Sequence, residues 1–205
     1  MKIGIMGGTF DPPHLGHTVP VEVVSAQFGL DIVWFLPSFL PPHKRRPDLT
    51  DSYHRAAMVA IALQPYPRFL LSPEELATGM VRYTVDTLAA WKGRLKPEDR
   101  LFFIMGSDSF MEIETWHDHG RLLQQCEFII IDRGIDQEAL KSKLDQIEKA
   151  LQLRLTEIIH FAPTPYLPIS STEIRKSLHD GLSVSASLSP GVEEYIKKQS
   201  LYQRR

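Results

Sequence analysis

The chain has 205 residues, of which 43% are hydrophobic and 23% are charged, and its formal net charge is -2. These values fit a soluble globular protein, and the lack of a basic excess argues against nucleic acid or an anionic membrane as a partner. The single cysteine, Cys126, excludes an internal disulfide, and no apolar run approaches the roughly 20 residues that span a bilayer, so we expect a cytoplasmic protein.

Short apolar runs alternate with longer amphipathic segments. In chain order, strands are predicted over residues 3–6, 32–36, 69–71, 101–105, 128–131 and 158–161. Helices are predicted over residues 15–28, 53–63, 84–91, 107–113, 135–151, 171–178 and 192–198, the last of them introduced by Ser189 and Pro190. This order predicts an α/β fold with a doubly wound, mainly parallel sheet. We expect one domain over residues 1–205, with a small helical portion from about residue 170.

The segment from Gly7 to His17 follows the first predicted strand and opens the first predicted helix. It reads Gly-Gly-Thr-Phe-Asp-Pro-Pro-His-Leu-Gly-His. The adjacent glycines Gly7 and Gly8 allow the backbone to approach a ligand closely, and the positive end of the following helix points at the same place. The segment therefore predicts an anion site, although it matches neither the P-loop nor the Gly-x-Gly-x-x-Gly fingerprint.

His14 and His17 stand three residues apart in the predicted first turn of this helix. Residues with that spacing share a helix face, so both imidazoles can donate hydrogen bonds to one polyphosphate. Zinc binding is the rival interpretation. It is disfavoured because the sequence has neither a two-histidine helix motif with an internal glutamate nor a cysteine cluster.

A second helix start with anion-binding character is predicted in residues 169–178, after the last strand of the sheet. Ser170 or Ser171 is a natural N-cap there, with Glu173 in the first turn. Arg175 adds a planar guanidinium that suits phosphate oxygens. We therefore predict that the two helix starts, far apart in the sequence, converge on one triphosphate.

Both motifs resemble those of the nucleotidyltransferase superfamily with its (H/T)xGH signature. Residues 7–17 are similar to the form found in bacterial nicotinate-nucleotide adenylyltransferases, and residues 169–178 resemble the Ile-Ser-Ser-Thr/Ser-x-Ile-Arg signature, which binds the ATP phosphates in that superfamily. The resemblance extends from Gly7 to about Leu201, and it implies a Rossmann-like nucleotidyltransferase fold.

The middle of the chain carries further segments of the same resemblance. Pro37 and residues 41–44 are similar to a Pro-x-x-x-Pro-Pro-His-Lys/Arg loop, which implies that Lys44 contacts phosphates. Residues 82–88 resemble a Ser/Thr-Tyr-Thr-x-x-Thr-Leu segment that faces the carboxylate of the pyridine ring, with Arg82 in place of the usual Ser or Thr.

Three single positions complete the resemblance to the family. Asp108, in a Gly-x-Asp segment, is expected to accept hydrogen bonds from a ribose. Trp116 resembles an indole that stacks on the pyridine ring, and its polar neighbours favour a partly exposed ring. Arg133 matches a basic residue at the end of a strand, although the proline that usually follows is missing here.

The resemblance implies an enzyme that transfers the adenylyl group of ATP to nicotinate mononucleotide, releasing pyrophosphate and forming nicotinate adenine dinucleotide for NAD biosynthesis. Mg²⁺ is expected with ATP, held mainly by substrate phosphates and by no dedicated protein ligands. The implied catalytic residues are His14, His17, Lys44 and Arg175. Those implied in ATP binding are Gly7, Gly8, Thr9, Phe10, His14, His17, Gly106, Asp108, Ser170, Ser171, Thr172 and Arg175. Those implied in mononucleotide binding are Gly8, Thr9, Lys44, Tyr83, Thr84, Asp108, Trp116 and Arg133.

Other functions stay open at this point. A transferase of the same superfamily could use nicotinamide mononucleotide or phosphopantetheine as the acceptor. A nucleotide-sensing module without turnover, or a metal-dependent hydrolase using Asp11, His14 and His17, would belong to other classes. The sequence also leaves open a homo-oligomer.

Overall fold

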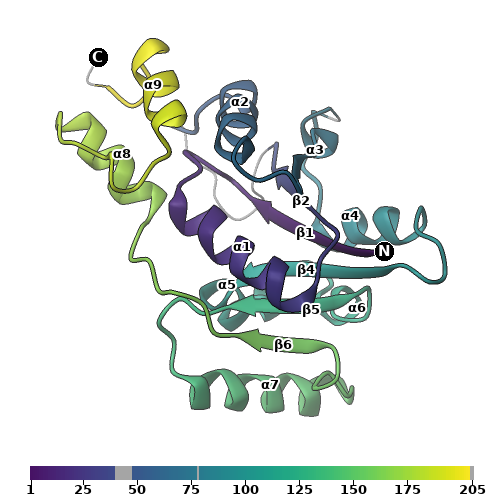
Figure 1. The fold of residues 1–205 in the computed structure, drawn as a ribbon. Coiled ribbons are helices and arrows are strands. Elements are labelled where there is room, and N and C mark those ends of the chain that lie inside the picture. The colour runs from purple at the N-terminus through teal and green to yellow at the C-terminus, as the bar shows by residue number, and fades with distance from the viewer. Residues whose placement is uncertain (40–47, 78, 204–205) are drawn as a thin grey trace. The chain divides into compact units, whose positions relative to one another are not determined.

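The computed structural model describes residues 1–39, 48–77 and 79–203. The strands form a six-stranded sheet in the order β3-β2-β1-β4-β5-β6 (Figure 1). The pairs β1–β4, β4–β5 and β5–β6 are all parallel. This is the strand order of doubly wound nucleotide-binding sheets, and it confirms the predicted fold class. The strands are β1 (Lys2–Gly8), β2 (Ile32–Pro37), β3 (Phe69–Leu71), β4 (Arg100–Gly106), β5 (Glu127–Ile131) and β6 (Ile159–Ala162).

Contacts within the chain define two compact units. The first unit comprises Met1–Met6, Val23–Val33 and Tyr83–Tyr166. The second unit comprises Gly7–Glu22, Trp34–Arg82 and Leu167–Arg205. The expectation of one domain over the whole chain stays a prediction.

The first unit packs helices on both faces of its strands. Successive residues of a strand point to opposite faces. Accordingly, Phe102 contacts Phe28 at the end of helix α1 (Leu15–Phe28), whereas Phe103 contacts Trp116. Because helices cover both faces of these strands, side chains on both faces are apolar, and the strands read as uninterrupted apolar runs. The other helices of this unit are α4 (Thr84–Lys92), α5 (Ser107–Met111), the 3-10 turn η1 (Ile113–Thr115), α6 (His119–Leu122) and α7 (Gln137–Leu151).

The second unit has an apolar core of its own beneath its C-terminal helices. Helix α2 (Ser52–Leu63) packs against α9 (Pro190–Lys198), as Figure 1 shows. Their buried side chains form one cluster with Ile174 of α8 (Ser171–His179). The remaining short helix of this unit is α3 (Glu74–Ala77). None of the helices in the described part of the chain has both the length and the apolar character needed to cross a membrane.

Most predicted elements are confirmed, and the differences have local causes. The helix predicted over residues 107–113 ends at Met111 and is followed by η1. The helix predicted from residue 135 begins at Gln137, because the Asp136 carboxylate accepts a hydrogen bond from the amide of Ala139 and caps it there. Helices α3 and α6 were not predicted, since four residues are too few to show a helical period.

Candidate active site

His14 and His17 lie together where α1 begins, in the second unit. Their ring centroids are 3.7 Å apart. The prediction that both stand in the first turn is wrong for His14, which immediately precedes the helix and acts as its N-cap residue. The His14 amide donates a hydrogen bond of 3.2 Å to Nδ1 of His17. This bond is one of the two that make up a capping box, with an imidazole where Glu or Gln usually stands.

The same hydrogen bond selects the tautomer of His17. Because Nδ1 accepts the bond from the His14 amide, it carries no proton in this arrangement, and Nε2 is the nitrogen that bears one. His17 is half-buried, whereas His14 is buried. In this arrangement Nε2 is the hydrogen-bond donor of His17, which suits contact with an anion.

Two glycines leave room for the rings at this site. A methyl group on Gly8 would lie 2.8 Å from Cζ of Phe10, and one on Gly16 would lie 3.0 Å from Nδ1 of His14. Phe10 is buried and packs edge-on to His17 with 5.1 Å between centroids. The Phe10 side chain therefore supports His17 from within the protein, and only its backbone is suited to bind a nucleotide.

The second motif contacts the first motif within the second unit. Ser170 is the N-cap of α8, and its hydroxyl accepts a hydrogen bond of 3.2 Å from the amide of Glu173. The Ser171 hydroxyl donates to the carbonyl of Pro12 at 3.0 Å, and Nη1 of Arg175 donates to the carbonyl of Asp11 at 2.7 Å. The two motifs therefore contact each other, and their convergence on one triphosphate stays a prediction.

Tyr202 joins the same cluster, a contact that could not be predicted from the sequence. Its hydroxyl donates a hydrogen bond of 2.6 Å to Oδ1 of Asp11, a carboxylate that is 1% exposed. Nη1 of Arg175 lies 4.0 Å from Oδ2 of the same carboxylate. Burial, and then the charge of Asp11, raise the pKa of Tyr202 far above its ordinary value. The end of the described chain thus fixes Asp11, in the middle of the first motif.

We expect Tyr202→Phe to destabilise the protein by about 1–3 kcal/mol at pH 7, because it leaves a buried carboxylate short of a donor. The raised pKa means that the folded state holds the phenolic proton more tightly than the unfolded state does. The protonated Tyr202 side chain therefore contributes its full stabilisation of the folded state below pH about 10, and this stabilisation is lost as the pH rises further. Urea unfolding is measured from pH 7 to 11. The difference in unfolding free energy between wild type and Tyr202→Phe should become smaller above pH about 10. Tyr53→Phe, at an exposed tyrosine, serves as the control. If the difference in unfolding free energy between wild type and Tyr202→Phe did not change with pH, the role given to the Tyr202–Asp11 hydrogen bond would be contradicted.

Asp108 and Arg133 lie together in the first unit, after the ends of β4 and β5. Nε of Arg133 is 3.9 Å from Oδ1 of Asp108, and the Arg133 amide donates to the hydroxyl of buried Ser107 at 2.9 Å. A methyl group on Gly106 would lie 2.3 Å from Oδ1 of Asp108 and 2.7 Å from Nε of Arg133. Gly106 is therefore required for these two side chains to occupy their positions.

The aromatic residues predicted for the pyridine ring also lie in the first unit. Trp116 is half-buried and edge-on to Phe103 of β4, with 6.3 Å between ring centroids. Tyr83 precedes α4, is exposed, and stacks on His117 at 4.0 Å. The sequence had not predicted that stacking. Both rings offer aromatic surface that solvent can reach.

Of the predicted residues Lys44 and Arg82, the structure describes only Arg82. Lys44 lies outside the described residues, in the segment 40–47. In the second unit, Arg82 stands 3.9 Å from Oε1 of Glu74, so its charge is partly balanced by a carboxylate. Among the residues that the structure describes, no group of three or more His, Cys, Asp and Glu side chains is arranged to hold a metal ion.

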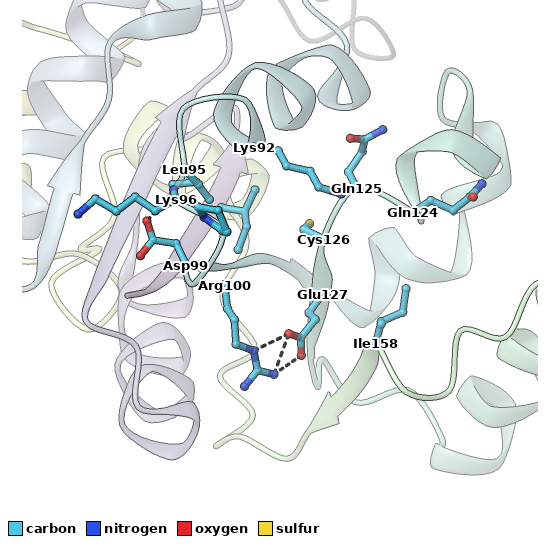
Figure 2. A pocket seen from close by; sticks show the side chains of 12 residues that line it. Lys92, Leu95, Lys96, Asp99, Arg100, Gln124, Gln125, Cys126, Glu127 and Ile158 are labelled. Carbon is cyan, nitrogen blue, oxygen red and sulfur yellow. Dashed lines mark hydrogen bonds and ion pairs between the residues drawn. The ribbon is translucent and has the colours of Figure 1, made fainter.

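A hollow of about 490 Å³ lies at the amino ends of the strands of the first unit, away from the segments that follow their carboxyl ends (Figure 2). The guanidinium of Arg100 pairs there with both carboxylate oxygens of Glu127 at 2.8 Å. Burial raises the pKa of the Cys126 thiol to about 12, so it carries no thiolate at neutral pH. The hollow therefore offers no activated nucleophile.

Comparisons with known proteins place these features in context. Residues 5–177 match the model of the cytidylyltransferase-like family. The whole chain is 39% identical to the probable nicotinate-nucleotide adenylyltransferase of Moorella thermoacetica, over 93% of that protein. It is 35% identical to the nicotinate-nucleotide adenylyltransferase of Bacillus subtilis, over 98% of each chain. The nicotinic acid mononucleotide adenylyltransferase of Plasmodium falciparum, solved in complex with NaAD, is similar with a TM-score of 0.79 and 25% identity, over 98% of this chain and 97% of that one.

Proposed function

The chain belongs to the cytidylyltransferase-like family and, within it, to the nicotinate-nucleotide adenylyltransferases, and from that membership we propose how its residues transfer the adenylyl group of ATP to nicotinate mononucleotide. The reaction releases pyrophosphate and forms nicotinate adenine dinucleotide, a step of NAD biosynthesis. The observation that carries the proposal is the His14–His17 pair, held beside a second motif that bonds to residues 11 and 12.

The triphosphate of ATP is assigned to the second unit. His14 and His17 face the ATP phosphates, and Nε2 of His17 donates to a phosphate oxygen. The backbone amides of the Gly7–Phe10 segment and the side chains of Lys44, Ser171, Thr172 and Arg175 complete the anion site. Arg175 already uses Nη1 for the Asp11 carbonyl and Nη2 for the Thr172 hydroxyl, at 2.7 and 3.3 Å. Those bonds orient the Arg175 guanidinium before ATP binds, which lowers the entropic cost of ordering this side chain on binding.

The ribose and the pyridine ring of the mononucleotide are assigned to residues of the first unit. Asp108 accepts hydrogen bonds from a ribose, Arg133 supplies a cation, and Trp116 stacks on the pyridine ring. Tyr83 makes no side-chain capping hydrogen bond to α4, so the first amides of that nine-residue helix suit the nicotinate carboxylate. An anion at a helix start gains about 0.3–2 kcal/mol, which corresponds to a preference over the neutral nicotinamide of roughly two- to thirtyfold.

The chemistry needs alignment and charge stabilisation more than a base. The mononucleotide phosphate has a second pKa near ~6, so it is mostly dianionic at neutral pH. One of its oxygens forms a bond to the α-phosphorus of ATP while the bond from that phosphorus to the bridging oxygen breaks and pyrophosphate leaves. His17 stabilises the charge that develops on the phosphate oxygens.

Mg²⁺ is proposed to enter with ATP as part of the substrate. The donor set fits that role: Asp11, the carboxylate of the first motif, is buried and hydrogen-bonded to Tyr202, so it is poorly placed to coordinate an ion. Phosphate oxygens and water suit Mg²⁺ as ligands. When bound, the ion would neutralise charge on the leaving pyrophosphate.

The test is a panel of acceptors supplied with ATP and Mg²⁺ while pyrophosphate release is followed. We expect the highest kcat/KM with nicotinate mononucleotide, a lower value with nicotinamide mononucleotide, and no turnover with phosphopantetheine. Phosphopantetheine as the best acceptor would overturn the assignment. The compartment is proposed to be the cytoplasm, in keeping with the lone cysteine, and sedimentation of the purified chain would test the homo-oligomer that the sequence leaves open.

A further inference from the structure

Arg55 is a buried arginine that donates hydrogen bonds to three backbone carbonyls. It lies in the first turns of α2 and is 0% exposed. Nε donates to the carbonyl of Thr50 at 2.9 Å, Nη1 to that of Thr9 at 2.7 Å, and Nη2 to that of Phe39 at 2.8 Å. One guanidinium thus joins three separate segments of the second unit. A planar fork with several fixed donors is the group suited to that task.

The bond to Thr9 acts on the predicted phosphate-binding backbone. The Thr9 carbonyl belongs to the peptide that links Thr9 to Phe10. Because a peptide group is planar and its C=O and N–H point in opposite directions, holding the carbonyl on Arg55 turns the Phe10 amide away from the buried guanidinium. Phe10 itself has a positive φ of 50°, a conformation that a non-glycine residue adopts at some cost. Arg55 therefore helps to keep this peptide in one orientation.

The other two bonds hold the backbone at Phe39 and Thr50. Phe39 is the last described residue before residues 40–47, and Thr50 follows shortly after them. Both carbonyls are held by the guanidinium that holds Thr9. The backbone at Phe39 and at Thr50 is thereby tied to Thr9 of the first motif.

We propose that Arg55 is a positioning residue for adenylyl transfer: without touching substrate, it fixes the Thr9–Phe10 peptide for the phosphates and ties the backbone at Phe39 and Thr50 to it. This inference rests on the proposed function. A side chain with no exposed surface acts through the groups that it holds, and misplacement of such groups by about 1 Å can cost ~10²-fold in rate.

The test uses Arg55→Lys, which keeps the positive charge but replaces the fork by one ammonium group. The matched control is Met58→Ala, which removes a fully buried side chain about one turn further along α2, where it packs in the C-terminal cluster. Thermal unfolding is measured first, and kinetics are then recorded well below the midpoint of each protein. We expect Arg55→Lys to lower kcat by about tenfold to a hundredfold and to raise KM for ATP, while Met58→Ala keeps the kcat of wild type.

The outcomes separate the two proposals. A wild-type protein that does not transfer adenylyl groups would reject the proposed function, and this inference with it. An active wild type with an equally active Arg55→Lys would reject the positioning role alone. Should Arg55→Lys not fold, Arg55→Gln is measured in its place, since it keeps one donor group. If both variants unfold while Met58→Ala folds, the role of Arg55 is purely structural and the inference is wrong.

Discussion

Replacing His17 by alanine should lower kcat by about 10²-fold or more, the loss seen when a preorganised donor to developing charge is removed. Nε2 of His17 is the donor in question, because Nδ1 is engaged by the His14 amide. Steady-state kinetics with saturating ATP and nicotinate mononucleotide measure the effect. An unchanged kcat would remove His17 from the mechanism.

Two further variants separate the cap from the catalysis. In His17→Asn the side-chain oxygen can take the place of Nδ1 and keep the cap on the His14 amide, but it cannot reach the position of Nε2. In His17→Gln the amide nitrogen can reach toward Nε2 and keep a donor there. We expect both variants to keep much of the unfolding free energy, since Gln is itself a usual capping residue at this position, and we expect Gln to preserve more of kcat. An Asn variant as active as the Gln variant would mean that His17 serves mainly to begin the helix.

The fold could be predicted from the sequence wherever the pattern of apolar residues is pronounced. The strands were recognised because residues such as those of β5 are apolar without interruption, which indicates parallel strands covered on both faces. Helix boundaries were less certain because single side chains decide them. Asp51 caps α2 at Ser52, one residue before the predicted start, by accepting from the amide of Tyr53 at 2.8 Å. A capping carboxylate can be recognised only once the helix is known.

The candidate site likewise contains residues that the sequence predicted and residues that it did not. The histidine pair and the Ser-Ser-Thr/Arg helix were predicted because those side chains carry the chemistry. Arg55 and Tyr202 were missed, because Arg55 binds backbone carbonyls, which any residue provides, and Tyr202 bonds to a residue 191 positions away. Nothing in the local sequence distinguishes them from an ordinary helix arginine or a tail tyrosine. Long-range contacts of this kind become visible only with the fold.

Trp116→Ala should raise KM for nicotinate mononucleotide by roughly five- to 150-fold, the equivalent of about 1–3 kcal/mol of stacking on an aromatic ring. The indole is half-buried with its edge contact to Phe103, and so has a fixed orientation and a face that solvent can reach. KM for ATP should change much less. The measurement is a pair of titrations, each substrate varied with the other saturating.

Trp116→Phe is the matched variant, because a smaller ring at the same position keeps part of the stacking surface. It should give an intermediate KM for the mononucleotide if stacking is the cause. Loss of the contact with Phe103 also lowers stability, so both variants are compared below their unfolding temperatures. A loss of stability alone reduces the concentration of folded enzyme and lowers the maximal rate, whereas a lost ring contact raises KM for one substrate. Equal increases of KM for both substrates would therefore contradict the assignment of Trp116 to the pyridine ring.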